Sequence, residues 1–301
     1  MLQRDIFIQE ITSAMEKNKN IFFLSADFGA EALDELRLKF PRQFIHCGIS
    51  EQAMVDMATG LSLDGRIVFV YAMAPFLSLR SIEQMKCGPA MMGLPIIFIS
   101  VGIGLGYADS GPTHYANEDF STIRSILGNK IFTLSCNSQT KYVAKKLLSQ
   151  PSFSYVRLDR NILPEFDLAK KNYFTDGFSI IGKASKKKKL IISSGKMTHL
   201  AFEVLKKSIN KFYIIDLFRS KPISGKLQKY LKLNSGIIVL DEQNINGGLA
   251  SALFEYSLIK NIQIKSKIKN ICLPEKYIYE NGGRDYLLKK FSLSWGKILN
   301  L

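Results

Sequence analysis

Short apolar runs alternate with segments of helical period along the first 165 residues. Apolar runs of strand length lie at 21–24, 44–47, 67–71, 95–101, 131–134 and 153–158. Between them, a 3.6-residue period predicts helices at 6–17, 51–63, about 76–92, about 118–127 and 138–148. Strands that alternate with helices in this way form a largely parallel sheet flanked by helices. The sequence therefore predicts an α/β fold.

The alternation restarts in the second half of the chain. Residues 161–175 contain a proline and show little periodicity, which is typical of a linker. Strands are predicted at 190–193, 212–217 and 236–240, and helices at 198–207 and 247–259. With 301 residues the chain is long enough for two cores. We predict two α/β domains, at residues 1–165 and 166–301, each a largely parallel sheet with helices on its faces.

The net charge of +15 is confined to one half of the chain. Residues 1–165 hold 16 basic and 16 acidic side chains, whereas the remainder holds 25 basic and 10 acidic ones. A basic surface can attract nucleic acid. However, the densest run, at residues 186–189, falls in a predicted loop without interleaved aromatic residues or a helix-turn-helix pattern. We interpret it as a solvated face and expect no nucleic-acid partner.

Cysteine usage and hydropathy indicate a cytoplasmic protein without a membrane segment. Cys47, Cys87, Cys136 and Cys272 are scattered, without a Cys-x-x-Cys pair, which predicts reduced and mostly buried thiols. The longest apolar stretch, at 94–106, is too short and too rich in glycine to span a bilayer. We therefore expect a soluble protein.

Glu51 is the first candidate for chemistry. It begins the predicted helix at 51–63, and Ser50 before it is a good N-cap. An acidic residue in a first helical turn also suits the helix dipole, so a purely structural role is one interpretation. The other is a ligand contact, because α/β sheets bind ligands at the carboxyl ends of their strands.

His114 is the second candidate. It follows a long loop at 102–112 that is rich in glycine and comes directly after a buried strand. Such loops often carry function, although a lone histidine is often structural. His199 lies in the first turn of a predicted helix, and we interpret it as a surface residue. The glycines of the loop lack dinucleotide-binding spacing, and no cluster has metal-ligand spacing.

Six segments, in this order and register, form one specific pattern over nearly the whole chain. They are residues 25–27, 44–52, 71–80, 111–119, 155–160 and 241–249. Each segment alone is a weak signal, but together they resemble the carboxyl-terminal half of the transketolase family of thiamine-diphosphate enzymes. The resemblance implies a pyrimidine-binding domain at 1–165 and a transketolase C-terminal-like domain at 166–301. It also favours the ligand interpretation of Glu51.

The resemblance implies a role for each matching residue. Glu51 would hydrogen-bond the pyrimidine ring of the cofactor, and His114 would face the substrate hydroxyls as an acid/base group. Phe76 matches the aromatic residue that packs on the pyrimidine. Asp27 matches a residue near the cofactor. Arg160 matches a position that often binds substrate phosphate, a task that suits guanidinium geometry.

Four further positions depart from the long single-chain transketolases and are included as candidates. Met73 stands where those enzymes have an aromatic residue in the pyrimidine pocket, so we assign it to the cofactor. Ser100 stands where they have a histidine that helps bind phosphate. Ser110, rather than an aspartate, precedes the Gly-Pro-Thr-His segment, and Asp109 lies one step away. We assign Ser100, Asp109 and Ser110 to the substrate.

The resemblance also implies a partner. The family binds Mg²⁺ and the diphosphate through a Gly-Asp-Gly segment followed by an asparagine, and this sequence contains no such pair. A separate N-terminal subunit would then carry the Mg²⁺ ligands, with thiamine diphosphate between the chains and two copies of each chain in a heterotetramer. The implied reaction moves a two-carbon ketol unit from a ketose to an aldose, in central or specialised sugar metabolism.

Three alternatives remain open on the sequence. Two keep thiamine diphosphate but change the reaction: a deoxyxylulose-phosphate synthase, or the β subunit of a 2-oxo acid dehydrogenase. The third is a non-catalytic binding subunit that uses the basic second half.

Overall fold

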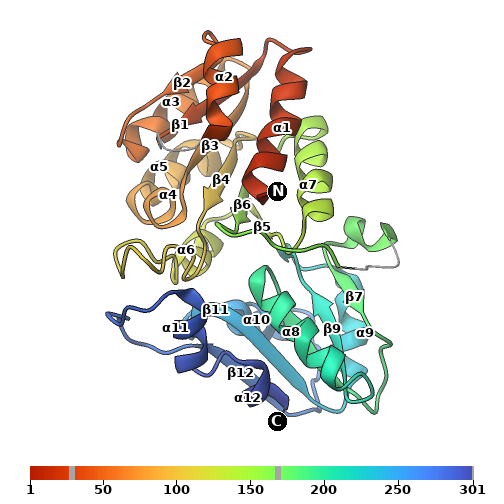
Figure 1. Ribbon diagram of the computed structural model, residues 1–301. Coiled ribbons are helices and arrows are strands. Elements are labelled where there is room, and N and C mark those ends of the chain that lie inside the picture. Colours follow the sequence, from red (N-terminus) through yellow and green to blue (C-terminus); the bar gives the residue numbers. More distant parts are fainter. Residues whose placement is uncertain (27–30, 167–170, 300–301) are drawn as a thin grey trace.

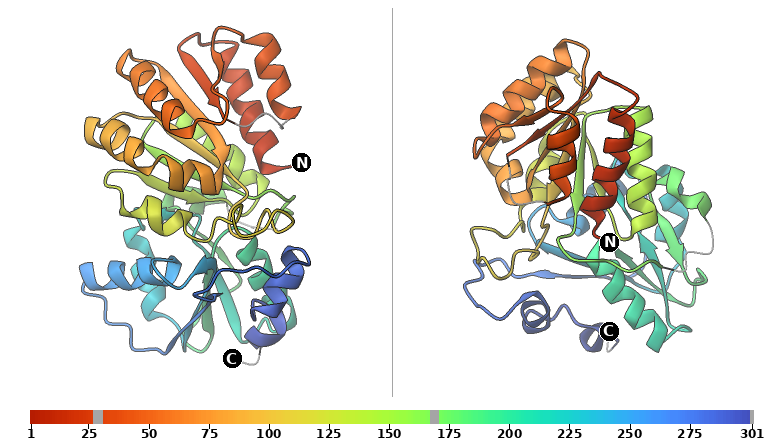
Figure 2. Two further views of the ribbon diagram at one scale, coloured as in Figure 1. Left: turned by 90° about the vertical axis from the view of Figure 1, so that its left-hand side faces the viewer. Right: turned by 45° about the horizontal axis from the view of Figure 1, so that its top comes forward.

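Two sheets, each flanked by helices, form the core of the computed structural model, which describes residues 1–26, 31–166 and 171–299 (Figures 1 and 2). The first sheet has seven strands in the order β10-β5-β6-β4-β3-β1-β2, and the second has five in the order β12-β11-β8-β9-β7. Only β10 and β7 run antiparallel to their neighbours among these paired strands. The predicted α/β class, with two largely parallel sheets, is confirmed.

The strands of the first sheet follow the apolar runs of the sequence. They are β1 (Ile21–Ser25), β2 (Phe44–His46), β3 (Ile67–Met73), β4 (Ile97–Val101), β5 (Lys130–Thr133) and β6 (Ser154–Leu158). The central strand β4 is buried at every residue, because helices cover both faces of the sheet. Its continuous apolar pattern therefore reflects its central position.

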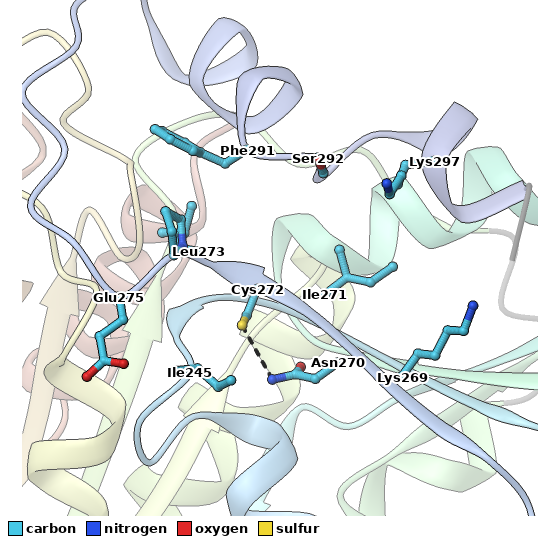
Figure 3. Close-up of a pocket in the computed structure, with 11 residues that line it drawn as sticks. Ile245, Lys269, Asn270, Ile271, Cys272, Leu273, Glu275, Phe291, Ser292 and Lys297 are labelled. Carbon is cyan, nitrogen blue, oxygen red and sulfur yellow. Dashed lines mark hydrogen bonds between the residues drawn. The ribbon is translucent and has the colours of Figure 1, made fainter.

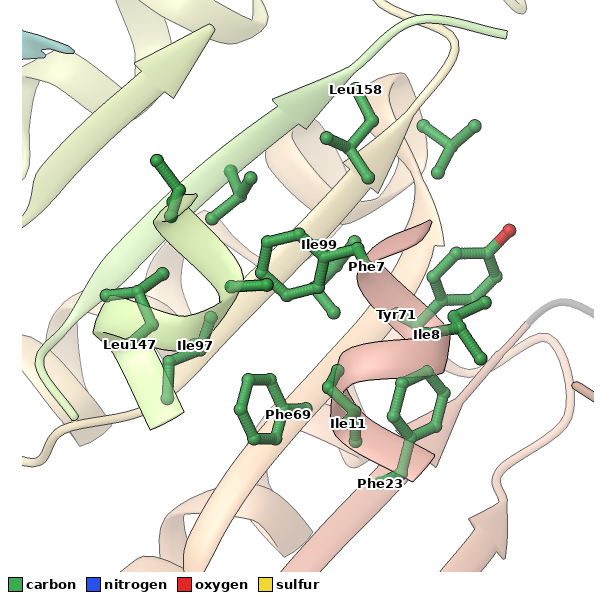
Figure 4. Packing of buried hydrophobic residues seen from close by; sticks show 14 of the residues in the cluster. Phe7, Ile8, Ile11, Phe23, Phe69, Tyr71, Ile97, Ile99, Leu147 and Leu158 are labelled. Atoms are coloured by element: carbon green, nitrogen blue, oxygen red, sulfur yellow. The ribbon is translucent and has the colours of Figure 1, made fainter. Parts of the chain in front are cut away.

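The helices of the first half cover the two faces of this sheet. Helices α1 (Gln3–Met15) and α7 (Asn137–Ser149) pack side by side on one face. On this face Phe7, Ile11 and Leu147 pack against strand residues such as Phe69 and Ile97 (Figure 4). The opposite face is covered by α3 (Glu51–Leu63), α4 (Ala74–Arg80) and α6 (Asp119–Ser125). A short helix, α2 (Asp34–Lys39), leads into β2.

The second sheet is built in the same way from β7 (Ser179–Ile181), β8 (Lys189–Ser193), β9 (Phe212–Asp216), β11 (Ile237–Asn244) and β12 (Ile268–Leu273). Helices α8 (Lys196–Lys207), α11 (Arg284–Lys290) and α12 (Trp295–Leu299) pack on one face. Helices α9 (Gln228–Lys232) and α10 (Leu249–Ile259) pack on the other. The sequence pattern did not predict β7, β12, α9, α11 or α12.

The two halves of the chain are tied together by backbone and side chains. Strand β10 (Arg219–Lys221) belongs to the second half of the sequence but pairs with β5 at the edge of the first sheet. Asp216, at the end of β9, accepts hydrogen bonds from Ser135 Oγ at 2.6 Å, from Thr198 Oγ1 at 2.9 Å and from Gln139. Burial raises the pKa of this carboxyl to about 6. Polar groups from both halves therefore meet in a buried interface.

The helix predicted at about 76–92 is interrupted. Helix α4 ends at Arg80, a short α5 (Ile82–Met85) follows, and residues Lys86–Ala90 form a π-helical turn, η2. Pro89 within this turn has no N–H to donate, which breaks the regular ladder. Gly88 lies so close to Thr59 of α3 that a Cβ atom would come within 2.5 Å of its hydroxyl. The break thus allows the segment to pack closely on α3.

Three smaller predictions were wrong. Ser50 precedes α3, but its hydroxyl donates to the carbonyl of Cys47 and does not cap the helix. Of the four free cysteines only Cys136 is buried. His199 is half-buried: its ring stacks on Phe166 at 4.2 Å, and its Nε2 lies 2.7 Å from the carbonyl oxygen of residue 135. Burial lowers the pKa of this imidazole.

Candidate functional site

The candidate site lies at the carboxyl ends of the first sheet's parallel strands. Helix α3 follows β2, helix α4 follows β3, and the glycine-rich loop follows β4. The segment after β6 begins with Asp159 and Arg160. Parallel strands bring all of these segments to one edge of the sheet, which is where α/β sheets bind ligands. In Figure 1 the loop after β4 lies between the two sheets.

Glu51 is a buried carboxylate with a single arginine partner. Its exposed fraction is 3% although it stands at the first position of α3. Arg80, the last residue of α4, places Nη1 3.1 Å and 3.0 Å from the two carboxylate oxygens. The Arg80 side chain itself is 41% exposed. A charge-assisted bond of this kind compensates for the loss of water around the buried carboxylate.

Phe76 connects this ion pair to His114. The Arg80 guanidinium carbon lies 3.9 Å from the centroid of the Phe76 ring, a close cation–π contact. The Phe76 ring also meets the His114 imidazole edge-on, with centroids 5.2 Å apart. Helix α4 and the glycine-rich loop therefore contribute adjacent aromatic rings to the site.

His114 is held at the end of the loop by local contacts. Its backbone N–H donates to Gly111 O, and its Nδ1 lies 2.9 Å from Thr113 Oγ1. The Thr113 hydroxyl can donate to or accept from Nδ1, and the role of Nε2 follows from the tautomer. The half-exposed ring is available to a ligand on the open side of the site.

Tyr107 and Asp109 of the loop both contact Arg160, which follows β6. Tyr107 lies 6.5 Å from the His114 ring, and the Arg160 guanidinium carbon lies 4.5 Å from the Tyr107 centroid. Arg160 also places Nη1 2.6 Å from Asp109 Oδ1, and this bond lowers the pKa of the Asp109 carboxyl. Both ends of this pair are exposed, at 40% for Arg160 and 64% for Asp109.

These contacts form one continuous line of side chains, which we call the charged–aromatic row. Its members, in spatial order, are Glu51, Arg80, Phe76, His114, Tyr107, Arg160 and Asp109. Five of the seven were candidates from the sequence. Arg80 and Tyr107 were not, although both lie close in the sequence to other members of the row. The sequence could have pointed to Arg80 and Tyr107 only through their closeness to Phe76 and His114 along the chain. It did not indicate which aromatic rings they would contact.

The remaining candidates are less directly placed. Met73 ends β3, one residue before α4, and is half-buried. Ser100 is fully buried in β4, where its hydroxyl donates to Val156 O at 3.1 Å, so it does not line an open surface. Ser110 is exposed beside Asp109. Asp27 lies outside the described residues.

A buried ion pair joins β6 to the start of α6. Arg157 in β6 donates from Nε and Nη2 to the two oxygens of Asp119 in α6, both at 2.8 Å. Arg157 also donates to Thr133 Oγ1, and Tyr155 donates to Asp119. The coulombic effect of Asp119 raises the pKa of Arg157 in spite of its burial. This network fixes the start of α6 against the sheet, directly after the loop that carries His114.

Two hollows lie away from the row. One, of about 570 Å³, is at β12 and is lined by residues that include Lys269, Cys272 and Ser292 (Figure 3). The other, of about 760 Å³, lies between residues 162–164 and helices α8, α11 and α12. Within the described ranges, no group of three or more His, Cys, Asp or Glu residues is arranged to hold a metal ion.

The part of the chain that the structure describes contains no helix long and apolar enough to cross a membrane.

Comparison with known proteins identifies the family. The model of the transketolase pyrimidine-binding domain matches residues 2–165, which is more than half of the chain. The chain therefore belongs to the transketolase pyrimidine-binding domain family.

Relatives in this family include proteins named as transketolase subunits. The chain is 28% identical over 266 residues to an apulose-4-phosphate transketolase subunit of Phocaeicola vulgatus, with 84% of this chain and 82% of that protein covered. It is 26% identical to the 6-deoxy-6-sulfo-D-fructose transketolase subunit SqwH of a Clostridium species, with 98% and 92% covered. Among solved structures, a split-gene transketolase in an inactive beta4 tetramer superposes with a TM-score of 0.82 at 23% identity, with 100% and 96% covered. That likeness confirms the fold.

Proposed function

We propose that this chain is the second subunit of a split transketolase, which moves a two-carbon ketol unit from a ketose to an aldose. One observation carries the proposal: Glu51, Phe76 and His114, the residues that the family resemblance selected, lie in a single contacting row at the carboxyl edge of the sheet. Similarity to proteins named as transketolase subunits, over most of their length, supports it.

The residues of the row fit the aminopyrimidine ring of thiamine diphosphate. Glu51 and Phe76 together already hold a planar, nitrogen-bearing group, the Arg80 guanidinium, bonded to the carboxylate and stacked on the ring. An aminopyrimidine is also planar and bears hydrogen-bonding nitrogens at its edge. We propose that Glu51 bonds the ring nitrogen and Phe76 packs on its face, with Met73 beside them, after Arg80 moves aside. Asp27 would also lie near the cofactor.

The chemistry is divided between the cofactor and this chain. Thiamine diphosphate, when bound, supplies the electron sink for the transferred two-carbon unit. This chain would orient the pyrimidine ring through Glu51, whose buried carboxyl can exchange a proton with a ring nitrogen. His114 would hold and move a proton at the substrate hydroxyls. Asp109, Ser110 and Arg160 would contact the more distal part of the sugar, with Ser100 beneath them.

A separate N-terminal subunit is proposed to complete the site and to carry the Mg²⁺ ligands, in a heterotetramer with two of each chain. Exposed apolar side chains beside the site support a docking surface. They are Ile49 (77% exposed), Leu79 (49%), Met91 (73%) and Met92 (55%), on or next to the mutually packed elements α3, α4 and η2. Contiguous exposed apolar groups of this kind are typical of interfaces.

Two further features are part of the proposal. We infer that residues 1–165 form the pyrimidine-binding domain and residues 166–301 the C-terminal-like domain, with β10 reaching across. We also infer a cytoplasmic location, since the four cysteines are unpaired.

Reconstitution tests the proposed function. This chain would be mixed with an N-terminal subunit that carries the Gly-Asp-Gly and asparagine segment, thiamine diphosphate and Mg²⁺, and assayed for two-carbon transfer from ketoses to aldoses. We expect turnover only when both chains are present. Release of CO₂ from pyruvate or a branched 2-oxo acid, without ketol transfer, would instead identify a synthase or a dehydrogenase subunit.

Replacement of Arg160 should affect phosphorylated sugars selectively. A hydrogen bond to a charged group contributes about 1.5–3 kcal/mol, so Arg160→Ala should raise the KM of a phosphorylated substrate about 10- to 100-fold. The kcat should change much less, because Arg160 lies at the far end of the row from Glu51. Steady-state kinetics with phosphorylated and unphosphorylated sugars would measure this.

Arg66→Ala is the matched control for Arg160→Ala. Arg66 is also an arginine near the surface that pairs with an aspartate, Asp64, at 3.0 Å and lies over an aromatic ring, that of Phe22, at 5.7 Å. It lies at the start of β3, at the opposite end of the strand from the site. Equal KM values for phosphorylated sugar in Arg160→Ala and wild type would remove Arg160 from the substrate site.

A further inference from the structure

The second half of the chain contacts both stems of the loop that carries His114. Its strand β11 ends next to this loop, and residues Glu242, Gln243 and Asn244 each bond to it. The loop leaves β4 through Gly104 and Leu105 and returns through Ala116 and Asn117 to α6. None of these β11 residues belongs to the charged–aromatic row.

The outgoing stem is bound by Glu242. The Leu105 backbone N–H donates to Glu242 Oε1 at 3.2 Å. Gly104 lies so close that a Cβ atom there would come within 2.6 Å of the Glu242 carboxylate carbon, and its φ of +58° also favours glycine. The glycine therefore allows the carboxylate to approach the loop backbone directly.

The returning stem is bound by Gln243. Its Nε2 donates to Ala116 O at 2.8 Å, and its Oε1 accepts from Phe120 N–H at 3.3 Å. Gly104 and Ala116 are also joined to each other by two backbone hydrogen bonds, at 3.2 Å and 2.9 Å. The neck of the loop is thus closed on itself and fixed to β11.

We call Glu242, Gln243 and Arg284, which hold the stems of the loop, the clamp. Arg284 connects it to the other end of the row. At the start of α11, it donates from Nε and Nη2 to both Glu242 oxygens, at 2.7 Å and 2.6 Å. Its Nη1 donates to Asp159 Oδ1 at 2.7 Å, and Asp159 is the residue before Arg160. The side chains of Arg284, Glu242 and Asp159 are 5%, 8% and 0% exposed. Buried charges paired in this way are rigid, because each loses its solvation if the pairing is broken.

We infer that Glu242, together with Arg284 and Gln243, positions the loop that carries His114. The C-terminal half of the chain thereby fixes where the side chains of His114 and Arg160 lie relative to the substrate. The clamp residues are positioning residues and do not touch the reacting atoms. The inference rests on the proposed function, because it assigns a role in turnover to a domain interface. A displacement of about 1 Å in a catalytic group can lower turnover about 100-fold.

Glu242→Gln tests the clamp with little change of shape. The new amide NH₂ would face N–H donors of Arg284 or of Leu105, so one bond of the clamp must break. In the reconstituted enzyme we expect kcat to fall about 10- to 100-fold. The half-saturating concentration of thiamine diphosphate should remain within about 3-fold of wild type, since Glu51 and Phe76 are held by α3 and α4.

Hydrogen exchange in the free chain gives a readout that needs neither partner nor cofactor. In Glu242→Gln the amides of Leu105 and Ala116 should exchange at least about 10-fold faster than in wild type, as expected when local opening becomes easier. The His114 ring resonances should broaden or shift for the same reason. If the reconstituted wild type shows no ketol transfer but Glu242→Gln still changes the amide exchange and the His114 resonances, the proposed reaction is refuted. The positioning role of the clamp is then still supported.

Glu255→Gln is the matched control. Like Glu242, Glu255 in α10 pairs with an arginine; its partner is Arg124 of the first half, with Nη2 2.9 Å from Oε1. This pair lies outside the hydrogen bonds of the clamp. Glu255→Gln should leave kcat and the exchange of Leu105 and Ala116 unchanged. If Glu242→Gln does not fold, Gln243→Met removes the bonds to Ala116 and Phe120 without altering a charge, and should give the same changes. Wild-type kcat and exchange in the folded clamp variant, or equal effects in Glu255→Gln, would overturn the inference.

Discussion

Glu51→Gln in the reconstituted enzyme should lower turnover by about 10²- to 10⁴-fold, the range associated with a positioned acid/base group. Glutamine has nearly the same shape and can still bond Arg80, so fold and subunit association should persist. It cannot, however, exchange a proton with a ring nitrogen. Steady-state kinetics, with circular dichroism and gel filtration of the mixed subunits, would measure the three properties together.

The control for this substitution is Glu83→Gln. Glu83 is also in the first turn of a helix, α5, but it lies outside the charged–aromatic row and is more accessible than Glu51. It should behave as wild type. Near-normal turnover in Glu51→Gln would refute the cofactor role of Glu51 and return it to the structural interpretation, a first-turn carboxylate stabilised by the helix dipole and Arg80.

Cofactor binding should be a property of the mixture and of neither chain alone. The row offers the pyrimidine one carboxylate and one aromatic face, whereas Mg²⁺ prefers oxygen ligands and substrate phosphates. We therefore expect no saturable binding when thiamine diphosphate and Mg²⁺ are titrated into this chain. Binding should become saturable when the N-terminal subunit is added, as isothermal titration calorimetry would show.

Phe76→Ala provides a graded test of the same prediction. Loss of a stacked aromatic contact should weaken cofactor binding by the mixture by about 1–3 kcal/mol, on the scale of ring stacking on aromatic side chains. Subunit association should be unchanged. Tight cofactor binding by this chain alone would contradict a shared site.

Elements with a clear apolar period were predictable from the sequence. Helix α3 runs over the predicted 51–63, and β4 lies within the apolar run 95–101. In these elements the residues that the local period makes apolar are also the ones that the fold buries. An apolar face therefore identifies the helix, and a continuous apolar run identifies the strand. The break after Arg80 was missed, although Pro89 within the segment is a local signal of an irregular helix. The close packing of Gly88 on Thr59 that accompanies the break is a tertiary contact, which the pattern does not contain.

Elements without such a period could not be predicted. Strand β10 is Arg-Ser-Lys and becomes a strand only because β5 offers it an edge. Strand β12 has mostly half-buried residues, since it is the last strand of its sheet. Both depend on contacts between segments far apart in the sequence, which a pattern of hydrophobic positions does not contain.

The candidate site divides in the same way. Glu51 and His114 were candidates from their local sequence, and the family resemblance favoured both. Phe76 and Arg160 came from the resemblance alone, and the structure brings all four into one row. Their connections through Arg80 and Tyr107, and the clamp of Glu242 and Arg284, are tertiary contacts between residues up to 137 positions apart, the separation of Leu105 from Glu242. No sequence spacing indicates such pairs, so the structure was needed to find them.

The most direct measurement is the distance from the Glu51 carboxyl to the cofactor ring in a crystal structure of the two subunits with thiamine diphosphate and Mg²⁺. We predict that a carboxyl oxygen lies within about 2.6–3.2 Å of the pyrimidine ring nitrogen, with Phe76 against the ring face and Arg80 displaced from both. A bound cofactor whose ring lies away from Glu51, with the Arg80 ion pair intact, would contradict the account.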